Sequence, residues 1–87
     1  MALSAEQLRI ASRIDRKIGK LLDAGRDDLA IMGDMSDYMP EFNRLMDTSS
    51  REEMDALSAR FPGFYYYGKI LEMVAKQIRS GEIKVPE

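Results

Sequence analysis

The sequence contains neither cysteine nor histidine in its 87 residues. Without cysteine the chain can form no disulfide and offers no thiolate as a nucleophile or a metal ligand. Without histidine it lacks the side chain that most often acts as a general base near neutral pH and most often binds transition metals. These absences exclude most familiar active sites. We therefore expect a protein that is not an enzyme and that holds no cofactor or metal.

Long apolar runs are also missing. No stretch of about 18 apolar residues, the length that spans a bilayer as a helix, occurs in the chain. The N-terminus lacks the basic segment followed by an apolar segment that marks an export signal. A composition of 45% hydrophobic and 32% charged residues is typical of a folded domain. We expect a cytosolic protein without membrane contacts.

Motifs of phosphate-binding loops, dinucleotide sites, nucleophile elbows and calcium loops are absent as well. Asp34, Asp37 and Glu41 fall on one face of a predicted helix, and grouped carboxylates can bind a hard cation or transfer protons. Solvated helices commonly carry such residues, however, and no histidine completes a di-iron pattern. We expect no metal site here, and no motif identifies a family.

The charges are distributed unevenly along the chain, although the net charge is only −2. Residues 1–20 carry five basic and two acidic side chains, residues 21–59 carry three and ten, and residues 60–87 carry five and three. The basic side chains of the first segment would suit phosphate groups, and would equally suit the acidic middle segment. Because the protein as a whole has no excess of basic residues, we favour a solvated or salt-bridged face and consider nucleic acid unlikely. The residues of this face are Arg9, Arg13, Arg16, Lys17 and Lys20.

The first predicted helix begins after Ser4. Ser4 and Gln7 have the spacing of a capping box, in which each residue satisfies a free backbone N–H of the other. Apolar residues then recur every three or four positions up to Leu22, and Gly25 follows where a left-handed C-terminal cap is expected. The pattern predicts one amphipathic helix of about 20 residues.

A second helix is predicted from Asp27 or Asp28. Its apolar stripe keeps its spacing on both sides of Pro40, although a proline inside a helix removes a hydrogen bond and clashes with the preceding turn. We therefore expect one kinked helix, or two collinear pieces broken between Ser36 and Pro40, rather than a loop. The stripe residues Ile31, Met35, Tyr38, Phe42 and Leu45 should all be substantially buried.

Two further helices complete the prediction. Ser50 and Glu53, or Ser49 and Glu52, can form another capping box. This third helix should stop at Phe61 because Pro62 and Gly63 follow. The fourth helix should run from about Phe64 to Arg79, and Gly81 and a short tail come after it. The predicted fold is all-α: a small up-and-down bundle of four helical segments, the second kinked or broken near Pro40, in a single helical domain spanning residues 1–87.

The fourth helix has more apolar side chains than one buried face can hold. Plotted on a helical wheel, its apolar arc approaches about 200°, whereas a helix packed on one side needs little more than about 100°. This helix is therefore either central in the bundle or covered by a second chain. Tyr67 continues the core stripe, Tyr65 lies on the charged side, and Tyr66 lies on the flank with Met73. The predicted partner-binding residues are Phe64, Tyr65, Tyr66, Ile70 and Met73.

Five methionines concentrate in the middle of the chain, at Met32, Met35, Met39, Met46 and Met54. Methionine suits both irregular core gaps and adaptable binding grooves, and we favour core filling. The leading functional hypothesis is a non-enzymatic protein–protein interaction module, a self-associating accessory or regulatory subunit that forms a homodimer and can also bind an unknown protein partner. The alternative is a small nucleic-acid-binding regulator that uses the basic face of the first helix.

Overall fold

The computed structural model describes residues 2–81, which fold into five α-helices, one short 3₁₀-helix and no strand. The tail predicted at residues 82–87 lies outside the described part. The elements are α1 (Ala5–Asp23), α2 (Asp28–Asp34), the 3₁₀-helix η1 (Ser36–Tyr38), α3 (Met39–Thr48), α4 (Arg51–Arg60) and α5 (Pro62–Ser80). The all-α prediction is confirmed. The four-segment up-and-down bundle is not confirmed, because the described residues form five α-helices.

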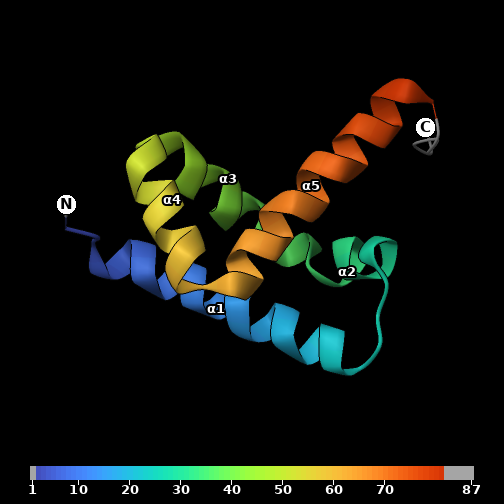
Figure 1. Ribbon diagram of the computed structural model, residues 1–87, viewed down its shortest axis with the longest axis horizontal. Coiled ribbons are helices and arrows are strands. Elements are labelled where there is room, and N and C mark those ends of the chain that lie inside the picture. Colours follow the sequence, from blue (N-terminus) through green and yellow to red (C-terminus); the bar gives the residue numbers. More distant parts are fainter. Residues whose placement is uncertain (1, 82–87) are drawn as a thin grey trace.

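The helices are arranged around α1 and α5, which make the most extensive contact of any two elements in residues 2–81. In Figure 1, α5 runs across the direction of α1 rather than alongside it, with α3 and α4 on one side and α2 on the other. The C-terminal half of α5 extends beyond the other helices. The central position of α5 explains part of its wide apolar arc, because α1, α2 and α4 all contact this helix.

Both predicted capping boxes are present, and they are joined to each other. The Ser4 hydroxyl accepts from the Gln7 N–H at the start of α1, and Ser50 and Glu53 make the equivalent pair at the start of α4. The Gln7 side-chain amide also donates to Ser49 Oγ at 3.0 Å and to Glu53 Oε2 at 3.1 Å. Hydrogen bonds to this carboxylate, first from the Ser50 backbone and then from Gln7, lower the pKa of Glu53. The two caps therefore hold the N-terminal ends of α1 and α4 together.

The break near Pro40 is confirmed. The helix ends at Asp34, the turn η1 follows, and Pro40 lies in the first turn of α3, where a missing N–H leaves no hydrogen bond unmade. Four of the five stripe residues are buried as predicted, namely Ile31, Met35, Phe42 and Leu45. Tyr38 is half-buried, because its ring lies at the surface beneath the Arg13 guanidinium, 5.5 Å from the ring centroid.

Aromatic side chains link α3 to α5 in the core. The ring of Phe42 packs against Phe64 at a centroid distance of 5.5 Å and meets Tyr67 edge-on at 5.2 Å. Tyr67 is fully buried, and its hydroxyl donates to the Met35 carbonyl at 3.4 Å. The prediction that Tyr67 belongs to the core is confirmed. The other buried residues of α1, α4 and α5 are Ile10, Ala11, Ile14, Ile18, Leu57, Ile70 and Val74.

The start of α5 differs from the prediction. Pro62 and Gly63 belong to the helix, because proline in the first turn is already in helical geometry and Gly63 does not have a positive φ. Gly63 is required instead for a close approach to α1, since a Cβ at this position would lie 2.7 Å from the Asp15 carbonyl oxygen. Its N–H donates to Asp15 Oδ1 at 2.6 Å. Asp15 thus caps a helix that has no side-chain cap of its own.

Candidate interaction surface

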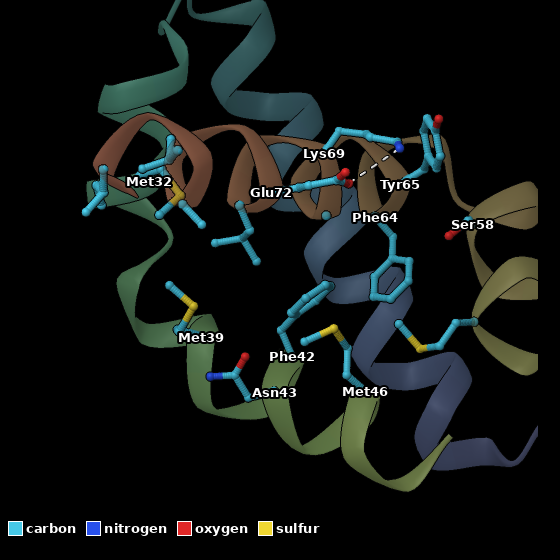
Figure 2. Close-up of a pocket in the computed structure, with 16 residues that line it drawn as sticks. Met32, Met39, Phe42, Asn43, Met46, Ser58, Phe64, Tyr65, Lys69 and Glu72 are labelled. Atoms are coloured by element: carbon cyan, nitrogen blue, oxygen red, sulfur yellow. Dashed lines mark ion pairs between the residues drawn. The ribbon is translucent and has the colours of Figure 1, made fainter. Parts of the chain in front are cut away.

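An apolar groove of about 590 Å³ lies between α3 and α5. Figure 2 shows Phe42 and Phe64 side by side at its base, with Met39, Asn43 and Met46 along the α3 side. The α5 side runs from Tyr65 to Ile78. The full lining is Met32, Met39, Phe42, Asn43, Met46, Met54, Ser58, Phe64, Tyr65, Gly68, Lys69, Leu71, Glu72, Val74, Ala75 and Ile78.

Four methionines from three helices line this groove. Met32 comes from α2, Met39 and Met46 from α3, and Met54 from α4. Of the five methionines in the middle segment, only Met35 is fully buried, as core filling predicts. Met32 and Met54 pack against the core and also face the groove, and Met46 is 46% exposed. Because methionine is flexible and polarisable, these walls can adapt to the shape of an occupant.

The groove has a small polar rim at its α5 edge. Lys69 Nζ forms an ion pair with Glu72 Oε2 at 3.5 Å and lies 5.5 Å from the centroid of the Tyr65 ring. Figure 2 shows Lys69 reaching between Glu72 and Tyr65. Tyr65 is 51% exposed, as expected for its place on the charged side of the wheel. Lys69 and Glu72 at this edge are paired with each other, and the interior of the groove is apolar.

The predicted partner-binding residues do not form one surface. Phe64 and Ile70 are buried, so Phe64 contributes only to the base of the groove and Ile70 belongs to the core. Tyr65 and Met73 are exposed, but only Tyr65 lines the groove. These residues point in different directions because the broad apolar arc of a central helix faces several neighbouring helices at once. Most of this arc is covered within the monomer.

Tyr66 has a partner inside the chain. Its hydroxyl donates to Asp28 Oδ1 at 2.7 Å, which attaches α5 to the start of α2. This hydrogen bond, followed by burial, raises the pKa of Tyr66, while burial raises the pKa of Tyr67. The half-buried Tyr66 therefore stabilises the fold, a role that the helical wheel did not predict.

Sequence reasoning missed the other groove residues, chiefly Gly68, Ala75 and Ile78 on α5 and Met46 on α3. Gly68 and Ala75 were missed because small residues add little to the apolar pattern of a helix. The concentration of methionines was the signal that could have found the groove, since methionine is favoured at adaptable binding surfaces.

The basic face of α1 is divided between paired and unpaired residues. Arg13 Nη1 donates to both Glu41 carboxylate oxygens, at 3.0 and 3.2 Å, and Arg9 lies 3.9 Å from the same carboxylate. Among residues 2–81, no carboxylate forms an ion pair with Arg16, Lys17 or Lys20. A hollow of about 220 Å³ is lined by Arg13, Arg16, Lys17, Lys20 and Tyr38.

Two of the three carboxylates considered as metal ligands, Asp34 and Glu41, are paired with different arginines. Asp34 accepts from Arg26 Nε at 2.9 Å, and Glu41 accepts from Arg13. No group of three or more acidic side chains within the described residues could hold a metal ion. In the same part of the chain, no helix has the length and apolar character needed to cross a membrane.

Comparison with known proteins gives no relative: no family model, curated protein or solved structure matches the chain.

Proposed function

We propose that the protein is a non-enzymatic interaction module that self-associates through the groove between α3 and α5, acting as an accessory or regulatory subunit. The observation that carries the proposal is the groove itself: about 590 Å³ of apolar space, lined by four methionines and open along one side of α5. A non-catalytic role is consistent with a sequence that has no cysteine and no histidine.

The groove suits a helix better than a small ligand. Sites for small molecules usually aim a few polar groups at the ligand. Here the two charged lining residues, Lys69 and Glu72, are paired with each other. From Tyr65 to Ile78 the α5 wall is about 20 Å long at the rise of an α-helix, enough to contact more than three turns of an amphipathic helix.

Charge substitution in the groove tests this proposal. Met46→Glu places a carboxylate in the apolar surface, and we expect the dimer dissociation constant to rise about tenfold or more, because the charge would lose water on association. Leu29→Glu is the matched control, since Leu29 is 58% exposed on α2 and does not line the groove. Light scattering over a wide concentration range measures the dimer dissociation constant of each variant.

Two results would contradict the proposal. One is a wild-type protein that stays monomeric at millimolar concentration. The other is a dimer that Leu29→Glu weakens and Met46→Glu leaves unchanged, because the contact would then lie at α2.

Nucleic-acid binding is the second candidate, and the three basic residues without carboxylate partners favour it. Arg16, Lys17 and Lys20 lie on one face of α1, where they could contact phosphates. Against it, Arg13 and Arg9 already form ion pairs with Glu41. Titration of the protein with double-stranded DNA at two salt concentrations decides between the candidates. Binding that falls steeply as salt rises, and that Lys17→Glu abolishes, would support this second candidate.

A further inference from the structure

We propose that the occupant of the groove is α5 of a second copy, antiparallel to the first, with the two-fold axis passing between Leu71 and Glu72. The inference rests on the proposed function and adds to it the identity, direction and register of the bound helix. A two-fold interface requires a surface that is complementary to itself, and the groove side of α5 meets that requirement in three respects.

The first respect is spacing. When α5 is reversed about the point between Leu71 and Glu72, the groove-lining residues Tyr65 to Ile78 map onto one another. Tyr65 lies opposite the partner's Ile78, and Gly68 lies opposite the partner's Ala75. The exposed Tyr65 at one end of the groove is thus at the same level along the helices as the exposed Ile78 of the partner.

The second respect is size. Gly68 and Ala75 are equally distant from the proposed axis, and both line the groove. A Cβ at Gly68 would lie 3.7 Å from Phe42 Cζ, which is an ordinary contact, so packing within the monomer does not require glycine here. Glycine inside a helix is less favourable than alanine. The close approach of a second helix would explain a glycine at this position, because the axes of packed helices come nearest where side chains are small.

The third respect is charge. In the proposed register Lys69 and the partner's Glu72 differ by two residues along the axis, which is about 3 Å at the helical rise. The ion pair that Lys69 and Glu72 form within one chain can therefore be exchanged between the two chains. Two such exchanges, related by the axis, place opposite charges beside each other. In this register the two Glu72 side chains lie next to each other at the axis and are flanked on each side by a Lys69, whereas parallel chains would also place Lys69 beside Lys69.

The required area is within reach of this surface. A specific dimer buries at least about 1,200 Å² in total, or about 600 Å² on each chain. This is about a tenth of the 5863 Å² that the described residues expose. The partner helix would cover Met39 and Met46 on α3 as well as the groove side of α5. It would also cover Ile78, which is 39% exposed on the part of α5 that extends beyond the other helices (Figure 1).

Disulfide trapping tests the register, and the chain is suited to it because it has no native cysteine. Glu72→Cys lies next to the axis, so we expect it to form a disulfide-linked dimer with itself under mild oxidation. Ala75→Cys alone should not, because the two copies of residue 75 would be about 10 Å apart along the axis. An equal mixture of Ala75→Cys and Gly68→Cys should form the mixed dimer, which mass spectrometry distinguishes by its mass. Lys76→Cys, on the charged face, is the matched control and should stay monomeric.

The outcomes separate this inference from the proposed function. Efficient trapping of Ala75→Cys with itself would indicate parallel helices and overturn the inference. If no cysteine variant is trapped while Met46→Glu still dissociates the dimer, the groove binds a different element and the inference also fails, although the proposed function stands. A wild-type monomer at every concentration would remove both. Circular dichroism of each variant before oxidation confirms that the cysteines leave the helices intact.

Discussion

The two sides of α5 use glycine for opposite purposes. On the α1 side, Gly63 lies so close to Asp15 that an added Cβ would come within 2.7 Å of its carbonyl oxygen. On the groove side, Gly68 leaves room, with Phe42 Cζ 3.7 Å from the position of a Cβ. One side is closed by contacts within the chain, and the other has space that the chain does not use. The difference separates residues that build the fold from residues available to a partner.

Removal of Tyr67 should have the largest effect on the closed side. Tyr67→Ala deletes a fully buried ring that packs edge-on against Phe42, so we expect the free energy of unfolding to fall by about 3–5 kcal/mol. Urea denaturation followed by circular dichroism measures the change. A loss below about 1 kcal/mol would show that this side of α5 is not part of the core.

The two glycines form a matched pair of substitutions. Gly63→Ala should destabilise the protein by about 1–3 kcal/mol, because the contact is with the backbone of α1 and cannot be relieved by rotating a side chain. Gly68→Ala should instead stabilise the isolated monomer by up to about 1 kcal/mol, since alanine favours the helix. Thermal melts at low protein concentration compare them. Equal effects of the two substitutions would contradict the distinction between the two sides.

Tyrosine titration should weaken the closed side at alkaline pH. The pKa values of Tyr66 and Tyr67 are raised in the folded protein, so their contribution to stability is present below about pH 10, the ordinary tyrosine value, and is lost as the pH rises through the raised values. Urea melts at pH 8 and above pH 10 should show this loss. Tyr66→Phe should lower stability at pH 8 by about 1 kcal/mol, because the bond to Asp28 is lost, and should make the alkaline loss smaller. An equally large alkaline loss in this variant would show that Tyr66 does not contribute.

The smallest effect on folding should come from the open side. Tyr65 is half exposed and contacts Lys69 at the rim, so Tyr65→Ala should change monomer stability by no more than about 0.5 kcal/mol. Because Tyr65 also lines the groove, the same substitution should weaken association, as truncation of an interface aromatic does. Denaturation at low concentration and light scattering at high concentration separate the two effects. A variant that folds poorly and associates normally would reverse the assignment.

Local signals predicted much of this structure. The capping boxes at Ser4 and Ser50 depend on residues three positions apart, and the break at Pro40 depends on the chemistry of one residue, so the sequence contains each of them directly. The start of α5 was placed too late because Gly63 was interpreted as a turn residue. Its actual role, the approach to Asp15, involves a residue 48 positions away.

The candidate site was harder to predict for the same reason. A helical wheel shows how wide the apolar arc of α5 is, but not which neighbour covers each part of it. Of the residues predicted to bind a partner, Phe64 and Ile70 are buried within the monomer, and Tyr66 donates a hydrogen bond to Asp28. The groove depends on the gap between α3 and α5, which no local pattern encodes.

Concentration-dependent NMR of the wild-type protein tests the central claim most directly, because it shows both whether the chain self-associates and where. As the protein is diluted, we expect the amide resonances of Met46, Gly68 and Ala75 to shift together along one binding curve. Resonances of Lys17 on α1 and Leu29 on α2 should stay constant. Shifts confined to α1 or α2, or no shifts between micromolar and millimolar concentration, would contradict the account.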